Sequence, residues 1–163
     1  MTPSASNNSI RYKAFQRKDL DSMPQIETLP YDERLTMKAV SAVLPFRVNQ
    51  YVIDELIDWN NVPEDPIFQM TFPQRGMLDP IQLTELTDLI TRNAPDDILQ
   101  ATVRRIQNGL NPHPAGQVEL NVPMVNGDPL PGMQHKYRET VLFFPSQGQT
   151  CHAYCSYCFR WPQ

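Results

Sequence analysis

Proline is the residue that most limits the fold of this chain. It occurs 16 times among 163 residues, about twice its usual share of ~5%. Proline lacks a backbone N–H and its ring clashes with the preceding helical turn, so it interrupts helices and interior strands. We therefore expect short helices joined by extended connections. The chain is still long enough for one domain with a buried core, since 40% of its residues are hydrophobic and its net charge is −4.

Two helices are expected early in the chain. In the segment 31–44, Asp32 can cap the helix start, and apolar residues recur at helical spacing. Pro45 ends that helix and suits the first turn of a second one, which runs to about Asn60 and Asn61. The apolar stripes of these helices are Leu35, Ala39, Val40, Val43 and Leu44, and then Val48, Val52, Ile53, Leu56 and Ile57. The stripes predict a packed pair.

A second helical pair is expected after a proline-rich connection. Residues 62–80 hold four prolines with apolar residues between them, which favours an extended segment laid across another surface. Residues 83–90 and 98–106 each repeat apolar residues at helical spacing. Pro95 suits the first turn of the second of these helices, and Gly109 suits the position just beyond its end.

The rest of the chain has an extended pattern. The arm before residue 140 has turn signals at Asn126-Gly127-Asp128 and at Pro131-Gly132. Residues 140–144 form a continuous apolar run, which favours a buried strand of a parallel sheet. Loops that come after such strands hold the active sites of β/α barrels and open α/β sheets. We therefore expect a functional site after residue 144.

The expected fold is mainly α, and it divides into four parts. These are a disordered lead-in at 1–9, a helical N-terminal region at 10–110, an extended linker or arm at 111–139, and a strand with its adjoining loop at 140–163.

Charge and hydropathy exclude two classes of partner. The isoelectric point is about 5.3 and Lys and Arg form no cluster in the sequence, so nucleic acid is not an expected partner. No run approaches ~18 consecutive apolar residues, and the N-terminus lacks the apolar centre of a secretory signal. We expect a cytoplasmic protein with no membrane partner. In a reducing cytosol, clustered cysteines are more often metal ligands than disulfides.

All three cysteines lie in one short run. They are Cys151, Cys155 and Cys158, with Tyr157 directly before the last. Three thiolates at the spacing CxxxCxxC can hold three corners of a cubane iron–sulfur cluster and leave the fourth iron without a protein ligand. Such an open position is a place where chemistry can occur. The run therefore predicts a metal centre in the loop after the strand.

The pattern CxxxCx(aromatic)C after a hydrophobic strand resembles the signature of the radical S-adenosylmethionine enzymes. More narrowly, residues 128–144, the cysteine run and Phe159-Arg160 resemble the lysine 2,3-aminomutase family. Residues 44–51 and 65–69 resemble the helical N-terminal region of that family. The resemblance covers most of the chain, and the cysteine run is its most specific part.

The resemblance implies a set of cofactors. A 4Fe-4S cluster would be bound by Cys151, Cys155 and Cys158, its open iron would bind S-adenosylmethionine, and Tyr157 would lie against the adenine. The family also uses pyridoxal phosphate, which carries the migrating amino group of an amino-acid substrate. An electron donor must reduce the cluster. The implied activity is that of an isomerase, an amino-acid 2,3-aminomutase.

The chain departs from the family after the cysteine run. In the family, the β/α barrel and the lysine for pyridoxal phosphate come after this loop, whereas Lys13, Lys18, Lys38 and Lys136 all precede it. We therefore expect the N-terminal portion of such an enzyme, with the first strand of a truncated barrel, and no activity from this portion alone. The sequence identifies neither the substrate amino acid nor the oligomeric state; a homo-oligomer is one option.

Two other functions fit the same cysteines. A structural zinc site could be completed by His152 or His135, which would make the chain a small zinc-stabilised interaction module. An iron–sulfur electron carrier would use the same cluster but would need four protein ligands. Arg160 could pair with a carboxylate or a phosphate. Bound iron with sulfide would indicate the radical enzyme, whereas bound zinc would indicate the interaction module.

Overall fold

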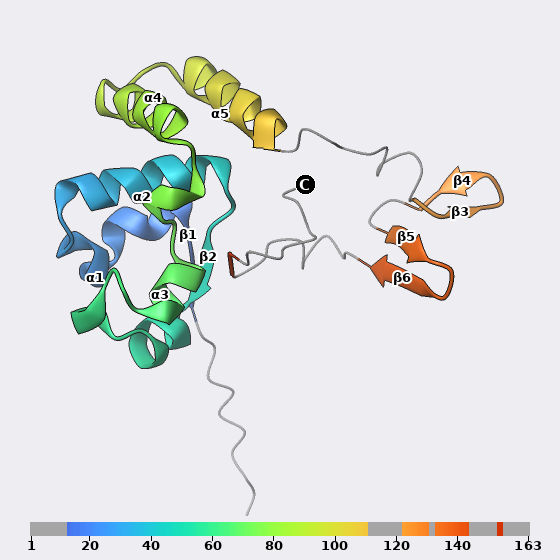
Figure 1. Ribbon diagram of the computed structural model, residues 1–163, viewed down its shortest axis with the longest axis horizontal. Helices are drawn as coiled ribbons and strands as arrows, with labels where there is room; N and C mark the ends of the chain where they lie inside the picture. Colours follow the sequence, from blue (N-terminus) through green and yellow to red (C-terminus); the bar gives the residue numbers. More distant parts are fainter. Residues whose placement is uncertain (1–12, 111–121, 131–132, 144–152, 155–163) are drawn as a thin grey trace, which may run out of the picture.

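A computed structural model describes four stretches of the chain, residues 13–110, 122–130, 133–143 and 153–154. The predicted lead-in at 1–9 and the predicted turn at Pro131-Gly132 lie outside these residues. Helices dominate the stretch up to residue 110, and the strands form three separate antiparallel pairs (Figure 1). Within the described stretches, no helix is long and apolar enough to cross a membrane.

The helical part begins with a short strand and ends with α5, a helix of 15 residues. In chain order, its elements are β1 (Ala14–Gln16), the 3₁₀ turn η1 (Arg17–Ser22), α1 (Pro24–Glu27), α2 (Tyr31–Val43), β2 (Arg47–Asn49), the π-helical turn η2 (Val52–Leu56), the 3₁₀ turn η3 (Trp59–Asn61), α3 (Pro66–Thr71), the 3₁₀ turn η4 (Arg75–Met77), α4 (Pro80–Thr91) and α5 (Asp96–Leu110). Strands β1 and β2 pair antiparallel, with Phe15 opposite Val48.

Helix α2 contributes to two hydrophobic cores. Its Met37 lies in the first core, which η1, α1, β2, η2 and α3 complete. Its Ala39, Val40 and Val43 lie in the second core, together with residues of α4 and α5. Figure 1 shows α4 and α5 on one side of α2 and α3 on the other. Full burial of one large apolar side chain stabilises a fold by about 1.5–3 kcal/mol. Because α2 contributes buried side chains to both cores, it connects them.

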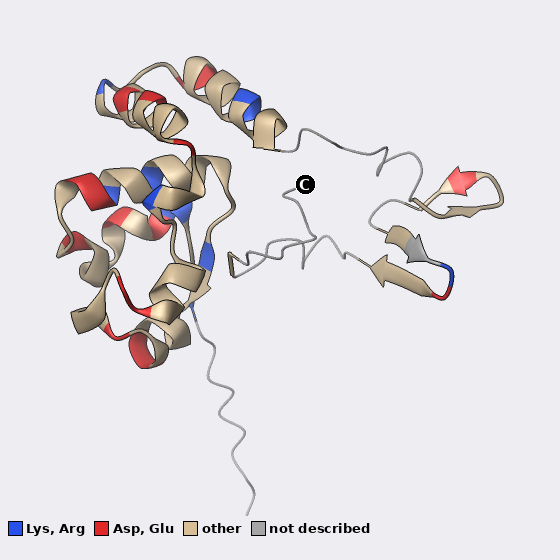
Figure 2. Cartoon of the chain, viewed as in Figure 1, with Lys and Arg blue, Asp and Glu red and all other residues tan. Residues whose placement is uncertain are grey.

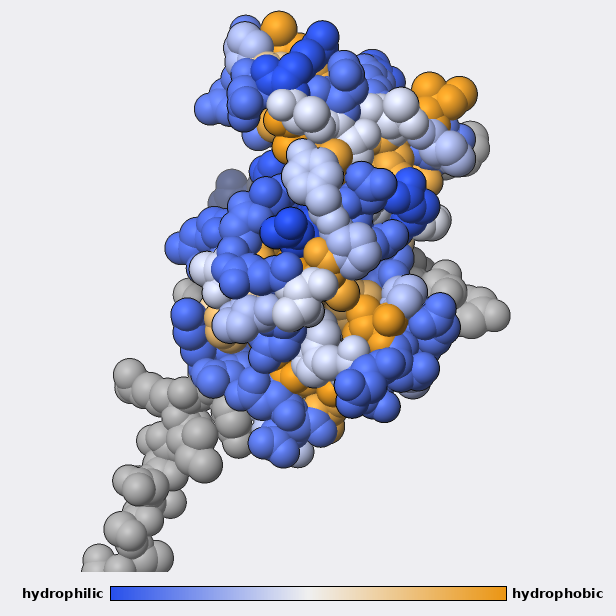
Figure 3. Space-filling view, turned by 90° about the vertical axis from the view of Figure 1, so that its left-hand side faces the viewer, coloured by the Kyte–Doolittle hydropathy of each residue, from blue (hydrophilic) through white to orange (hydrophobic). Residues whose placement is uncertain are grey.

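The outer surface is consistent with this packing. Figure 3 shows one face of the molecule, which is mainly hydrophilic and carries small, separate apolar patches. The largest side chains that are almost completely buried include Phe68 and Phe72 of the first core and Leu86 and Ile106 of the second. The apolar residues are therefore concentrated inside the two cores.

Two short helices start at Asp-Pro pairs. The carboxylate of Asp65 accepts a hydrogen bond from the N–H of Phe68 at 2.7 Å, and that of Asp79 accepts one from the N–H of Ile81 at 2.8 Å. These bonds satisfy donors that a helix start leaves without partners. The prediction that Asp32 caps α2 is wrong, because α2 begins one residue earlier and Asp32 lies in its first turn. There its negative charge still faces the positive end of the helix dipole.

The structure confirms the helices predicted at 31–44, 83–90 and 98–106, which correspond to α2, α4 and α5. Gly109 does not stop α5, which continues to Leu110. The single helix predicted after Pro45 is wrong. In its place lie strand β2 and the π-helical turn η2, because residues 47–49 pair with β1, from a distant part of the sequence.

The prediction of an extended connection at 62–80 is also wrong. This stretch contains α3 and η4, and its Phe68 and Phe72 are 1% and 0% exposed. Proline is compatible with the first turn of a helix, so Pro66 starts α3 rather than preventing it. Phe68 and Phe72 belong to the first core, and Leu78 belongs to the second.

The described part of the predicted arm at 111–139 folds into hairpin strands. Strands β3 (Met124–Val125) and β4 (Asp128–Pro129) are joined by Asn126 and Gly127, whose φ angles are 53° and 91°. The predicted turn at Asn126-Gly127-Asp128 is therefore confirmed, since positive φ at both central residues is typical of tight hairpins. Strand β5 (Met133–Tyr137) also falls in the arm.

The strand predicted at 140–144 is present as β6 (Thr140–Phe143), but its environment differs from the prediction. It pairs antiparallel with β5, and Val141 and Phe143 are 45% and 68% exposed. Arg138 and Glu139 alone connect the two strands, which suffices for an antiparallel pair, whereas a parallel pair needs a long crossover. Among the described strands no parallel pair occurs, so the expected barrel strand is an exposed hairpin strand here.

Candidate functional site

The predicted metal ligands Cys151, Cys155 and Cys158, together with Tyr157, lie outside the described residues. The same holds for His152 and Arg160. Where the structure describes the chain, no three His, Cys, Asp or Glu side chains come close enough to hold a metal ion. The argument for a metal centre therefore depends on the residue types of the three cysteines alone. Three thiolates are soft ligands, which both iron–sulfur clusters and zinc accept.

Tyr154 connects the cysteine segment, residues 151–158, to the helical part. Its backbone N–H donates a hydrogen bond to the carbonyl oxygen of Met70, with 2.7 Å between nitrogen and oxygen. Met70 lies in the last turn of α3, and Figure 1 shows the short described piece at 153–154 beside the helical part. One residue between the first two cysteines is thus held by α3.

The phenol of Tyr154 is partly withdrawn from solvent. Its Oη atom is buried and has no hydrogen-bond partner among the residues that the structure describes. Burial raises the pKa of the phenol above its ordinary value, because the charged form would lose its hydration. The side chain therefore stays neutral near pH 7.

The helix that holds Tyr154 is fixed by an aromatic cluster. The rings of Phe68 and Phe72 stack with centroids 4.9 Å apart. The indole of Trp59 lies edge-on to both, at 5.8 Å from each centroid. The Nε1–H of Trp59 also donates a hydrogen bond to the carbonyl oxygen of Ile53 at 2.8 Å. These contacts hold α3 against η2 and η3 in the first core.

The start of α3 is fixed by a buried carboxylate. Only 5% of Asp65 is exposed, and its two oxygens accept hydrogen bonds from the N–H groups of Phe68 and Asp58. The N–H of Asp65 donates in turn to the carbonyl oxygen of Asn61 at 2.8 Å. The start of α3 is therefore bonded to Asp58 and Asn61, and its last turn is bonded to Tyr154.

The described histidine and two of the lysines make other contacts. The imidazole of His135 in β5 is exposed, and its Nε2 lies 3.2 Å from the carbonyl oxygen of Arg138 in the same hairpin. Lys13 lies over the ring of Phe15, with Nζ 4.6 Å from the centroid. The Nζ of Lys38 forms an ion pair of 2.7 Å with Asp21. These contacts assign no lysine to pyridoxal phosphate.

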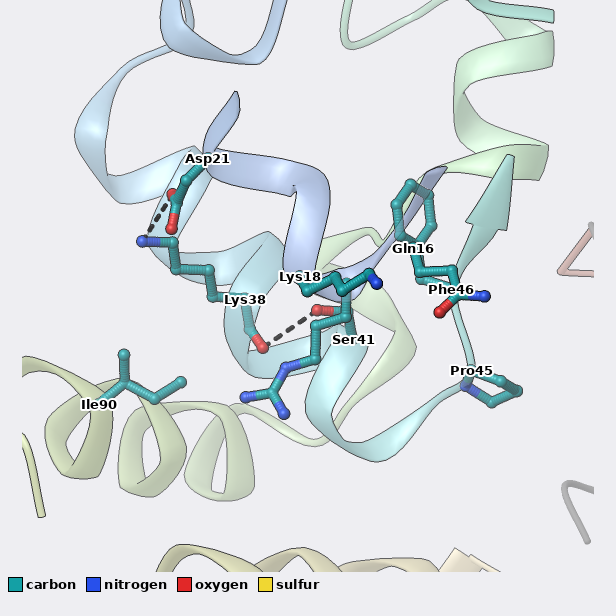
Figure 4. A pocket seen from close by; sticks show the side chains of 9 residues that line it. Gln16, Lys18, Asp21, Lys38, Ser41, Pro45, Phe46 and Ile90 are labelled. Carbon is teal, nitrogen blue, oxygen red and sulfur yellow. Dashed lines mark hydrogen bonds and ion pairs between the residues drawn. The ribbon is translucent and has the colours of Figure 1, made fainter. Parts of the chain in front are cut away.

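A shallow basic hollow of about 580 Å³ opens between η1, α2 and the end of α4. Arg17, Lys18 and Lys38 line it together with Asp21, and Figure 4 shows the ion pair between Lys38 and Asp21. An adjoining hollow of about 330 Å³ adds Arg34. Figure 2 shows the basic positions along α2. The sequence contains no Lys and Arg cluster, but the fold brings these four cations to one surface, where they would attract anions.

Comparisons with known proteins add no relative. No protein-family model matches the chain, and neither the curated proteins nor the solved structures contain a match.

The sequence pattern indicates the cysteines but not the contact between Tyr154 and Met70. In the sequence, Tyr154 is one aromatic residue within the cysteine run. Met70 is one of several apolar residues in the connection predicted at 62–80. No local pattern reports a hydrogen bond between residues so far apart in the chain. The Asp-Pro pair at 65–66 is a local pattern that is typical of a helix start, and it indicates the beginning of α3.

Proposed function

We propose that this chain carries the cluster-binding part of a radical S-adenosylmethionine enzyme related to the lysine 2,3-aminomutases. The observation that carries the proposal is the spacing of Cys151, Cys155 and Cys158. Three thiolates in this pattern supply three ligands to a 4Fe-4S cluster and leave one iron open. The hydrogen bond from the N–H of Tyr154 to the carbonyl of Met70 supports the proposal, because it attaches a residue between two of the cysteines to the helical part.

The residues of the cysteine segment would have separate roles. Cys151, Cys155 and Cys158 would bind the cluster as thiolates, and Tyr157 would lie against the adenine of S-adenosylmethionine. When bound and reduced, the cluster would supply the electron that cleaves S-adenosylmethionine. The backbone of Tyr154 would keep the segment on the helical part.

The complete proposed activity is the transfer of an amino group between adjacent carbons of an amino acid with pyridoxal phosphate. No residue of this chain is assigned to that cofactor or to the amino acid, because Lys13 and Lys38 are engaged elsewhere and Lys18 and Lys136 precede the cysteines. We therefore expect the 163-residue chain alone to show no aminomutase activity.

The experiment is anaerobic reconstitution of the purified chain with ferrous iron and sulfide, and then analysis of iron, sulfide and zinc. The electron paramagnetic resonance spectrum of the reduced protein is recorded with and without S-adenosylmethionine. We expect iron with sulfide, and a spectrum that changes when S-adenosylmethionine binds the open iron. Cys155→Ala should lose the cluster, while His135→Ala should keep it.

Each alternative function has its own outcome. Zinc that is retained without iron, and that is released in His135→Ala, would identify the zinc-stabilised module instead. A cluster whose spectrum does not respond to S-adenosylmethionine would identify an electron carrier. Either result would overturn the proposal.

A further inference from the structure

Two elements supply the four cations of the basic hollow, which here means both adjoining hollows between η1, α2 and the end of α4. Arg17 and Lys18 come from η1 and line only the larger hollow. Arg34 and Lys38 come from α2, where a spacing of four residues places them on one helix face. Arg34 lines only the smaller hollow, whereas Lys38 lines both (Figure 4 shows Lys38 at the larger one). The cations therefore share one continuous surface.

Three of these cations have no anionic partner in the part of the chain that the structure describes. Lys38 pairs with Asp21 at 2.7 Å, whereas Arg17, Lys18 and Arg34 form no ion pair with a described residue. The Nε of Arg34 is also buried, and it has no hydrogen-bond partner among the described residues. A buried N–H without an acceptor is unfavourable. An added acceptor at the smaller hollow would therefore stabilise Arg34.

The chain has few carboxylates that could fill this role. Asp21 is the one acidic residue among the lining side chains. The carboxylate of Asp19 on η1 accepts the backbone N–H of Gln16 at 2.8 Å. Outside the described stretches, the sequence contains a single acidic residue, Glu119. The hollow thus combines four cations with one carboxylate in a chain whose net charge is −4, which favours an anion from solution as its partner.

The lining side chains suit phosphate groups. A guanidinium presents its N–H donors in a planar fork that matches phosphate oxygens, and an ammonium adds a compact charge. Exposed ion pairs contribute little individually, so a ligand must contact several of these cations at once to bind well. The hollows, of about 580 and 330 Å³, leave room for more than one phosphate group. Linked phosphates would contact cations of both hollows, which a single phosphate would not.

We propose that the basic hollow binds a ligand with two or more linked phosphate groups, such as inorganic pyrophosphate or the phosphate chain of a nucleotide. Arg17 and Lys18 bind one phosphate group, and Arg34 binds another through its fork of donors. Lys38, held by Asp21, lies between them. The inference uses no residue of the cysteine segment, and it is independent of the proposed function.

The first measurement is calorimetric titration of the metal-free 163-residue chain at low salt with pyrophosphate, phosphate, adenosine diphosphate and adenosine. We expect pyrophosphate to bind about tenfold or more tightly than phosphate, because it contacts more cations, and adenosine not to bind. Equal affinity for pyrophosphate and adenosine diphosphate would assign the site to the phosphates alone, and tighter binding of the diphosphate would assign it to a nucleotide. Pyrophosphate that binds no more tightly than phosphate would overturn the proposal.

The second measurement locates the site with variants that each remove one positive charge. We expect Arg34→Gln to raise the Kd for pyrophosphate about tenfold, and Lys18→Gln, at an exposed side chain, to raise it about threefold. Arg104→Gln is the matched control, because Arg104 is exposed on α5 and does not line the hollow. Circular dichroism checks that each variant is folded.

The outcomes also separate this inference from the proposed function. Equal weakening by Lys18→Gln and Arg104→Gln would show that net charge alone attracts the ligand, and would overturn the site. Pyrophosphate binding by a chain that takes up no iron would support the site and overturn the cluster proposal. Iron uptake without pyrophosphate binding would do the reverse.

Discussion

The carboxylate of Asp65 accepts a hydrogen bond from the backbone N–H of Phe68, with 2.7 Å between Oδ1 and nitrogen. Its other oxygen accepts the N–H of Asp58 at 3.2 Å. One buried side chain therefore both starts α3 and fastens the chain that precedes it. Since the carbonyl of Met70 belongs to α3, the acceptor for Tyr154 depends on this carboxylate.

Replacing Asp65 should destabilise the fold more than replacing an exposed cap. We expect Asp65→Ala to lower the free energy of unfolding by about 2–3 kcal/mol, because the buried N–H of Phe68 and the partly buried N–H of Asp58 lose their acceptor. Asp79→Ala removes the exposed cap of α4 and should cost about 1 kcal/mol. Urea unfolding monitored by circular dichroism measures both. Equal losses would show that burial adds nothing at Asp65.

The aromatic cluster should be sensitive to truncation. Phe72 is completely buried and lies near the rings of Phe46, Trp59 and Phe68. We expect Phe72→Ala to cost about 3–5 kcal/mol, from lost burial and the cavity it leaves. Ile81→Ala on α4 is the control, because Ile81 is 78% exposed and should change stability by less than about 0.5 kcal/mol. A similar small effect in both variants would contradict the described core.

Two glycines should respond in opposite directions to alanine. Gly127 has a φ of 91°, which an alanine adopts only with strain, so Gly127→Ala should lower the population of the β3–β4 hairpin. Gly109 lies in α5, and an added Cβ meets no atom within 4 Å. Gly109→Ala should raise the free energy of unfolding by about 0.4–1 kcal/mol. NMR contacts between Met124 and Pro129 report on the hairpin, and thermal unfolding reports on the helix.

The ion pair between Glu85 and Arg105 should contribute little. It joins α4 to α5, and both side chains are largely exposed. We expect Glu85→Gln to cost about 0.2–1 kcal/mol at low salt, and less at ~1 M salt, where the charges are screened. Urea unfolding at both salt concentrations provides the test. A cost that does not depend on salt would indicate that packing, not charge, links these residues.

Local patterns predicted the parts of the fold that depend on nearby residues. Helices α2, α4 and α5 are predictable from apolar spacing, because one buried helical face requires a repeat of 3.6 residues. The hairpin turn at Asn126 and Gly127 is predictable from the preference of these residues for positive φ. The donor set of the candidate site is likewise a matter of residue type and spacing.

Tertiary contacts decided the rest. Residues 47–49 form a strand because β1 pairs with them. Phe68 of α3 is buried against Trp59, and Phe72, directly after α3, is buried against Phe46. Residues 140–143 form an antiparallel hairpin with β5, and Thr140, Val141 and Phe143 are exposed.

Three cysteines at a cluster-like spacing and three amphipathic helices follow from local sequence, since each depends on residues close together in the chain. The hydrogen bond from the N–H of Tyr154 to the carbonyl of Met70 instead arises from the folding of the chain. A backbone hydrogen bond involves groups that every residue except proline carries. Its partners are therefore chosen by the packing that brings two distant segments together, and not by the identity of the residues.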